Sequence, residues 1–173
     1  FAGQRLQFLL AGLARQGVEA AERVLDLRQH GIERGFRDRR IAAVGLQMSL
    51  VAIEGNGMVG VPGISARIFS ALARMRVNVM MISQASSEHN VCVVIPQKDR
   101  PKAVQELQSE FEADIARKIV DTIKVQDGVS IVAVVGEGMR GMPGIAGKTF
   151  SAVAQANVNV VAIAQGASEL NIS

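Results

Sequence analysis

Apolar positions along the chain alternate between short β-branched runs and longer helical repeats. Residues 49–54 are mainly apolar and β-branched, which predicts a strand. After a glycine-rich loop, Ile64, Ile68 and Leu72 recur at i, i+4 and i+8, as on one face of a helix. Residues 78–83 then predict a second buried strand.

A polar turn and a second helix complete the unit. Residues 85–90 are short and polar, so residues 91–95 should return as an antiparallel third strand. Asp99 and Pro101 mark the start of a helix. The apolar face of this helix carries Ala103, Leu107, Phe111 and Ile115. Residues 120–125 predict a final strand, and the order βαββαβ indicates a ferredoxin-like fold of the α+β class.

The same unit occurs twice in the chain. Residues 50–92 can be laid over residues 131–173 without a gap, at a shift of 81 positions (131 − 50), and about half of the paired residues are identical. We therefore predict two modules in tandem, interleaved or side by side. The expected bounds are a helical segment of uncertain affiliation at 1–39, a first module at 40–126 and a truncated second module at 127–173. Because the chain begins at Phe1 and stops inside an expected strand, we expect it to be a fragment of a longer protein.

The charge and the aromatic content narrow the classes of partner. The net charge is +3 over 173 residues, and 3% of the residues are aromatic, with no Trp and no Tyr. A nucleic-acid partner is therefore not expected, because it needs a basic field or stacking rings. A membrane is not expected either, since every apolar run is far shorter than the roughly 18 residues of a membrane span. With the single cysteine Cys92 the chain forms no internal disulfide, and we expect a reducing, cytoplasmic location.

Both glycine loops match the G-x-G-x-x-G pattern of dinucleotide-binding proteins. The pattern is met at residues 55–60 and 136–141, each time between an expected strand and an expected helix. A Rossmann site also needs an acidic residue about 20 positions further on, and residues 75–81 and 156–162 contain none. The next strand turns into a hairpin, whereas a Rossmann fold needs another crossover helix. Nucleotide binding is therefore disfavoured, and no cofactor is expected in this chain.

The glycine loops end at the N-termini of helices, where unpaired N–H groups favour an anion such as a carboxylate. Nearby side-chain amides offer donors and acceptors. They are Asn56, Asn78 and Gln84 in the first copy, and Asn159 and Gln165 in the second. An α-amino acid, with its carboxylate, its ammonium and a short side chain, matches such a corner. The competing interpretation is that the glycines, Asn78 and Asn159 only shape turns.

The remaining reactive side chains show no catalytic or metal-binding arrangement. Cys92 lies among valines in an expected strand, which indicates a buried, inert thiol. His30 and His89 have no Cys or carboxylate at metal-ligand spacing, so no metal site is expected. Ser86 and Ser87 lie in the polar turn without a triad partner. The chain is therefore expected to be non-catalytic.

The glycine loops and the residues after the second strands resemble a known family. Residues 136–145 (GEGMRGMPGI) and 156–169 are similar to the second ACT module of aspartate kinases, especially of the form fused to homoserine dehydrogenase. Residues 55–64 and 82–88 are similar to the first module. The resemblance covers residues 40–173. It implies ACT folds that pair sheet to sheet, within one chain or between the two chains of a homodimer.

The resemblance also implies a binding site for a feedback amino acid. The effector-binding residues would be Asn56, Met58, Ile64, Asn78, Val79 and Gln84 in the first copy, and Met139, Ile145, Asn159, Val160 and Gln165 in the second. Gln84 and Gln165 match the glutamines that sense threonine in the fused relatives, so threonine is the expected effector. The parent protein would be an aspartate kinase, alone or fused to homoserine dehydrogenase, with ATP and Mg in a kinase domain of the same or another chain.

Two features depart from the family pattern. No kinase motif of the KFGGTS type occurs in the chain, and residues 1–39 do not match the family. Two alternatives to a feedback-inhibited kinase region stay open. One is a free-standing ACT regulatory subunit that binds lysine, methionine or isoleucine. The other is a purely structural dimerisation module.

Overall fold

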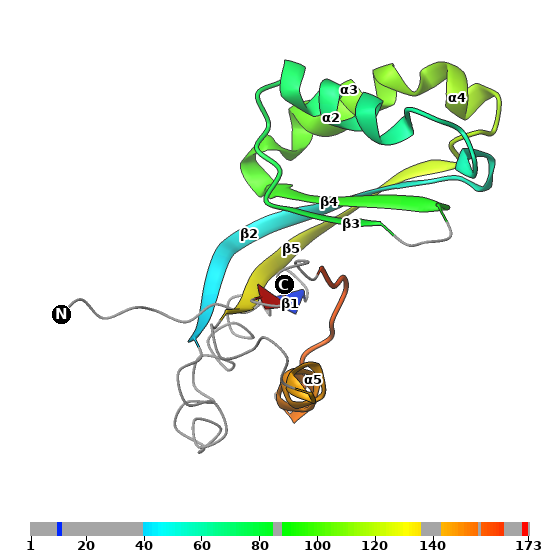
Figure 1. Ribbon diagram of the computed structural model, residues 1–173. Coiled ribbons are helices and arrows are strands. Elements are labelled where there is room, and N and C mark those ends of the chain that lie inside the picture. The colour runs from blue at the N-terminus through cyan, green and yellow to red at the C-terminus, as the bar shows by residue number, and fades with distance from the viewer. Residues whose placement is uncertain are drawn as a thin grey trace. The chain divides into compact units, whose positions relative to one another are not determined.

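The computed structural model describes residues 10–11, 40–84, 88–135, 143–155, 157–164 and 171–172 (Figure 1). The chain divides into two compact units. One of them, the continuous unit, is Met48–Asp127, and the other, the split unit, consists of Phe1–Gln47 and Gly128–Ser173. In sequence, the continuous unit is therefore inserted between the two parts of the split unit. The module bounds of 40–126 and 127–173 stay a prediction.

The strands of the continuous unit form an antiparallel sheet in the order β5-β2-β4-β3. In chain order they are β2 (Arg40–Glu54), β3 (Met81–Gln84), β4 (Asn90–Pro96) and β5 (Thr122–Val135). The register places Val51 of β2 opposite Val93 of β4, and Met81 of β3 opposite Val94 of β4. This order, together with a helix after β2 and another after β4, confirms the predicted ferredoxin-like βαββαβ arrangement.

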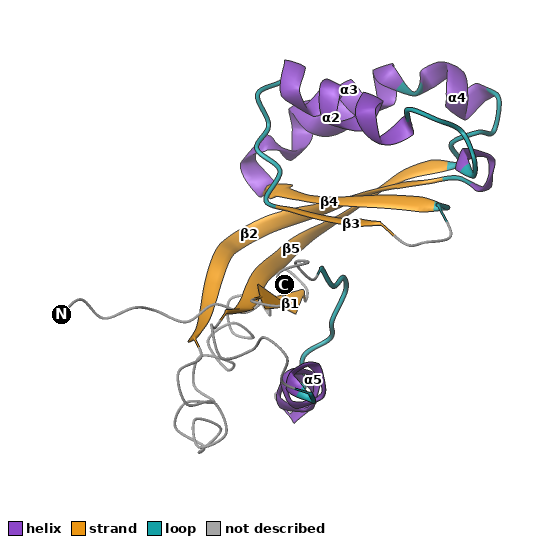
Figure 2. Cartoon of the chain, in the orientation of Figure 1, coloured by secondary structure: helices purple, strands orange, loops and turns teal. Residues whose placement is uncertain are grey.

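Three helices cover one face of this sheet (Figure 2). They are α2 (Ile64–Arg74), α3 (Arg100–Glu110) and α4 (Glu112–Ala116). Alternate strand residues, such as Val51 and Ile53 of β2 and Val93 of β4, are buried in one core with the apolar stripes of the helices. The helices contribute Ile68, Leu72, Ala103 and Leu107 to this core. Burial of this apolar surface is the main term that stabilises the unit.

The second predicted helix is divided in two. Phe111 has φ and ψ of −103° and 11°, which ends α3 before α4 begins. Ile115, which the pattern predicts on the buried face, therefore leaves the core and is 36% exposed. Phe111 itself is fully buried, so the break lets the chain turn while it keeps its largest apolar side chain in the core.

Two strand boundaries also differ from the predicted ones. The strand predicted at 78–83 is the shorter β3, because Met81 is the first residue of the paired register with β4. The strand predicted at 120–125 does not stop there but continues as β5 to Val135. Its second half finds further partners in the split unit, which a pattern read over a few residues does not reveal.

The split unit contains a counterpart of α2. β5 pairs antiparallel with β1 (Leu10–Ala11) and with β6 (Asn171–Ile172). α5 (Ile145–Gln155) corresponds to α2 at the shift of 81 positions and buries Ile145, Thr149, Ala152 and Val153. Residues 158–164 form no strand. Leu10–Ala11 form a strand where the sequence predicts a helical segment, and the rest of 1–39 lies outside the described residues.

The first two glycines of the loop after β2 permit a close approach of backbone. A Cβ atom at Gly55 would collide with the backbone oxygen of Ile119, and one at Gly57 would lie 2.6 Å from the Cα atom of Ile119. Gly60 and Gly63 instead have positive φ angles, of 70° and 89°, with open space around them. The protein's own backbone therefore fills the space beside the first two glycines, where a dinucleotide-binding loop would hold a pyrophosphate.

Two glycine substitutions should have opposite effects on stability. Gly55→Ala should lower the free energy of unfolding by about 1–3 kcal/mol, because the new methyl group meets fixed backbone. Gly147→Ala, in α5 with open space around it, should raise it by about 0.5–1 kcal/mol through helix propensity. Urea unfolding of both variants measures the difference. Equal effects of the two substitutions would contradict the close approach at Gly55.

Candidate functional site

A pocket of about 500 Å³ lies where the glycine loop, the start of α2 and the end of β3 meet. It is lined by Met58, residues 60–66, Gln84, Glu88 and Val91. All these residues belong to the continuous unit. The strand β2 and the close approach of the glycine loop to Ile119 set the position of one wall, and β3 and β4 set the position of the other.

The pocket combines an apolar lining with polar groups. Met58, Ile64 and Val91 are buried members of the core cluster, so they present a rigid apolar surface. Gln84 and Glu88 are exposed, and they bring an amide and a carboxylate to the same pocket. The site can therefore contact both an apolar side chain and charged groups of a small molecule.

The start of α2 adds unpaired backbone donors to the pocket. The residue before the helix, Gly63, has a positive φ angle, and no side chain caps the first turn of the helix. The first N–H groups of a helix have no partner within it, and the helix dipole favours negative charge at this end. Ser65 and Ala66, in that first turn, line the pocket. The arrangement suits a carboxylate in the pocket.

Glu88 is a pocket residue that the sequence analysis does not single out. Its Oε2 atom accepts a hydrogen bond of 2.9 Å from the backbone N–H of Gly60, so the turn after β3 is tied to the glycine loop. Glu88 also has a positive φ angle of 57°, which is unusual for a glutamate. The repeat offers a signal for this residue, because Glu88 and Glu169 are identical at the shift of 81 positions.

The structure brings together half of the effector residues expected in the first copy. Met58, Ile64 and Gln84 line the same pocket. The other three, Asn56, Asn78 and Val79, are not among its lining residues within the described part of the chain. The role of all six in effector binding stays a prediction.

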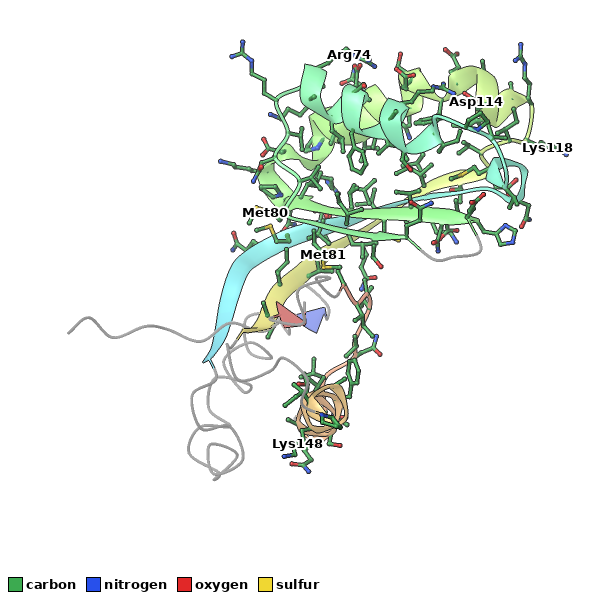
Figure 3. All side chains as sticks on the ribbon, viewed as in Figure 1. Arg74, Met80, Met81, Asp114, Lys118 and Lys148 are labelled. Atoms are coloured by element: carbon green, nitrogen blue, oxygen red, sulfur yellow. The ribbon has the colours of Figure 1, made fainter. Side chains whose placement is uncertain are left out.

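The side chain of Asn78 has a partner in its own turn. Its Nδ2 atom donates to the sulfur of Met80 at 3.0 Å, and Met80 is labelled in Figure 3. Asn56 lies in the 3-10 turn η2 (Asn56–Met58), and its backbone N–H donates to Asp121 Oδ2 at 3.1 Å. Neither contact involves a residue that lines the pocket.

The expected residues of the second copy are only partly described. Met139 and Gln165 lie outside the described residues. Ile145 is buried at the start of α5, Asn159 is exposed and Val160 is half-buried in the segment after that helix. Ile145 and Ile64 thus occupy equivalent positions at the starts of two helices. The effector role of these five residues also stays a prediction.

The remaining candidates offer no alternative site in the described part of the chain. There, no group of three or more His, Cys, Asp or Glu side chains is placed to hold a metal ion. Nor is any helix among the described residues long and apolar enough to cross a membrane. Cys92 is half-buried rather than fully buried as the pattern predicts. Burial, and secondarily the carboxylate of Glu54, raise the pKa of its thiol above the ordinary value.

The two copies of the repeat coincide with the match to a known family. The ACT domain family matches residues 51–111 and 132–173. The chain belongs to the ACT domain family. The match covers both glycine loops, α2, α3, α5 and all the residues that line the pocket, and it confirms the resemblance seen in the sequence.

The relatives that the ACT-domain chain matches are much longer proteins. Over 126 residues it is 45% identical to bifunctional aspartokinase/homoserine dehydrogenase 1, chloroplastic, of Arabidopsis thaliana. Over another 126-residue alignment it is 40% identical to the bifunctional aspartokinase/homoserine dehydrogenase of Haemophilus influenzae. Each alignment covers 73% of this chain, but only 14% and 16% of the two relatives. The chain is therefore similar to one region of these proteins.

Solved structures with the same fold come from aspartate kinases. The aspartate kinase of Clostridium acetobutylicum matches with a TM-score of 0.65 and 27% identity, over 77% of this chain and 30% of that chain. The regulatory subunit of aspartate kinase from Thermus flavus matches with a TM-score of 0.60 and 24% identity, over 78% of this chain and 84% of that chain. The second likeness shows that a separate subunit carries the same fold.

The raised pKa of Cys92 has a direct chemical consequence. Iodoacetamide should alkylate Cys92 in the folded ACT-domain chain at pH 7 more slowly than it alkylates the chain in urea, because less thiolate forms and access is restricted. Glu54→Gln should raise the folded-state rate, since it removes a negative charge that disfavours the thiolate. Mass spectrometry of timed samples measures the rates. A folded rate equal to the rate in urea would contradict the burial of this thiol.

Proposed function

We propose that the chain is the regulatory region of an aspartate kinase, and that the pocket of the first copy binds threonine as a feedback effector. The observation that carries the proposal is the meeting of Gln84 with the uncapped start of α2 in one pocket. The similarity to bifunctional aspartokinase/homoserine dehydrogenases supports it. Because the chain spans 14–16% of those relatives, the kinase activity and its substrates belong to the proposed parent protein.

Each part of an α-amino acid has a counterpart in the pocket. The carboxylate would accept hydrogen bonds from the first turn of α2. The ammonium would lie beside the carboxylate of Glu88, one oxygen of which is held by the N–H of Gly60. A side-chain hydroxyl would reach the amide of Gln84, and a methyl group would contact Met58 and Val91. Threonine has all four of these groups in a small volume.

The regulatory effect would be a shift between two arrangements of the parent protein. A ligand that binds one arrangement more tightly shifts the equilibrium between the two arrangements. The shift equals the difference in binding free energy, typically about 1–3 kcal/mol, and it would change the activity of the attached kinase domain. The pocket suits this role because its walls belong to different elements, the glycine loop and the turn after β3. A ligand that spans both walls would stabilise the arrangement in which they lie close together.

Two glutamine substitutions test the proposed site. A hydrogen bond from a buried amide to a ligand contributes about 0.5–1.5 kcal/mol, or more where a charge is involved. Gln84→Ala should therefore weaken threonine binding to this pocket by several-fold to about tenfold, and Gln165→Ala should do the same at the site expected in the second copy. Since Gln84 is exposed in the unliganded protein, its loss should leave the thermal midpoint nearly unchanged. Calorimetric titration and thermal unfolding measure the two quantities.

The control for this experiment is Gln105→Ala, which removes an exposed glutamine of α3 that does not line the pocket. It should leave threonine affinity unchanged. If threonine affinity is unchanged in both Gln84→Ala and Gln165→Ala, the two glutamines do not bind the effector. If the unsubstituted chain does not bind threonine, lysine, methionine and isoleucine are the next effectors to titrate.

Self-association through the ACT modules is the second part of the proposal. The sheet face away from the helices carries Leu50, Ala52 and Val94, and these side chains are already buried in the single chain. The apolar side chains left exposed lie elsewhere, with Ile82 of β3 47% exposed and Val59 of the glycine loop 48% exposed. β3 is the last strand of the sheet among the described residues, and the exposed side chain of Ile82 gives this strand an apolar surface for a second copy.

A charge on β3 should therefore prevent the homodimer. Ile82→Lys should convert a dimer to a monomer at micromolar concentration, because the edge strand would carry a charge at its most exposed apolar position. Ile115→Lys, which places the same charge on an exposed isoleucine of α4, serves as the control and should leave the dimer intact. Light scattering after size-exclusion chromatography gives the mass. If the unsubstituted chain is monomeric under these conditions, this part of the proposal is wrong.

A further inference from the structure

Arg67 makes more polar contacts than any other side chain in the described part of the helical layer. Its Nε atom donates to Glu110 Oε1 at 2.9 Å, and its Nη2 atom donates to the backbone oxygen of Glu110 and to Asp114 Oδ2, both at 2.7 Å. The guanidinium lies 4.5 Å from the centre of the Phe111 ring. One side chain of α2 is thus fixed to the end of α3 and to α4.

These contacts require an arginine. The hydrogen bonds that Arg67 donates to Asp114 and Glu110 raise its pKa, and those that Arg67 and Arg74 donate to Glu110 lower the pKa of that carboxyl group. A planar guanidinium can bind several acceptors at fixed angles while it stacks on a ring, whereas a lysine ammonium is a single point charge. The geometry of α2 relative to α3 therefore depends on the shape of Arg67 as well as on its charge.

Arg67 lies directly beside the pocket. It is the fourth residue of α2, and its backbone N–H donates to the oxygen of Gly63 at 3.0 Å in the first turn of the helix. Gly63 and the residues up to Ala66 line the pocket. A shift of Arg67 would therefore move the backbone N–H groups that face the pocket.

A second path leads from Arg67 to the opposite end of the glycine loop. The backbone oxygen of Asp114, whose carboxylate binds Arg67, accepts from the N–H groups of Ile119 at 2.9 Å and Val120 at 3.3 Å. Gly55 and Gly57 pack against the backbone of Ile119. Figure 3 shows Asp114 in the helical layer and Lys118 at the turn before Ile119. Arg67 thus connects both ends of the loop that forms one pocket wall.

We propose that Arg67 is a positioning residue for the effector pocket of the first copy, a role that rests on the proposed function of this pocket. It holds the first turn of α2 and the glycine loop at the spacing that the carboxylate of an amino acid needs. It does not contact the ligand itself.

Arg74 provides a matched comparison on the same helix. It also forms two ion pairs with α3, to Glu106 and Glu110, and Figure 3 shows it in the same layer. It lies seven residues after Arg67, about 10 Å further along the helix axis, at the end away from the pocket. Arg74 should therefore stabilise the contact between α2 and α3 without setting the geometry of the pocket.

The second copy lacks this arrangement among its described residues. Lys148 occupies the position equivalent to Arg67 (67 + 81) and is exposed in α5. No ion pair joins it to a residue that the structure describes. The second copy thus keeps the positive charge at this position but not the planar guanidinium.

The test compares Arg67→Met and Arg74→Met in the full chain by two measurements. Without ligand, amide hydrogen exchange at residues 67–70, the first N–H groups of α2 that have partners along the helix, should rise in Arg67→Met and stay unchanged in Arg74→Met, although both variants lose two ion pairs. With threonine as the probe, Arg67→Met should weaken binding about threefold to tenfold, and Arg74→Met by less than about twofold. The threonine affinity of Arg67→Lys should lie between those of the unsubstituted chain and of Arg67→Met, because lysine keeps the positive charge but lacks the planar guanidinium.

The outcomes separate this role from the proposed function. Unchanged exchange at residues 67–70 in Arg67→Met would overturn the positioning role, whatever the ligand. Equal loss of threonine affinity in Arg67→Met and Arg74→Met would overturn it as well, since both would then act through general stability. If the unsubstituted chain does not bind threonine, the proposed effector is wrong. The hydrogen-exchange measurement then decides by itself whether Arg67 holds the start of α2.

Discussion

The backbone of Ile119 occupies the space in which side chains at positions 55 and 57 would lie. This close approach holds the chain that leaves β2 against the turn that leads into β5, although the two segments are more than sixty residues apart. Backbone hydrogen bonds reinforce it, from Asp121 to Glu54 at 2.7 Å and from Gly55 to His89 at 2.9 Å. The start of α2, and with it the pocket, is placed by this contact.

Four of the ion pairs of the continuous unit join α2 to the helices α3 and α4. Arg67 and Arg74 each bind two carboxylates there, while 37% and 51% of their side-chain surfaces stay exposed. Pairs as exposed as these typically contribute less than about 1 kcal/mol each to stability, because water and salt screen them. The apolar core holds the layers together, and the ion pairs link the side chains of α2 to those of α3 and α4 at the edge of that core.

The two copies share a fold and differ in their surroundings. Four of the six residues of the two glycine loops are identical, Gly63 and Gly144 both have positive φ angles, and Ile64 and Ile145 are both buried, so the two helices begin in the same way. Arg67 and Lys148 then differ at an equivalent position, as do Ser65 and Ala146 in the first turns. A duplicated module can thus keep its core while the polar residues around each helix start diverge.

Periodicity and self-similarity within the sequence determined the duplicated ferredoxin-like unit, the buried faces of α2 and α3, and the glycine loop that ends at a helix. These features follow from the local pattern of side chains, which the chain carries in any conformation. Only the tertiary structure decided that Glu88 binds Gly60, that Arg67 binds Asp114, and that β5 continues into the split unit. Each of these depends on residues far apart in sequence whose distance is set by packing of the core, and no local pattern encodes that distance.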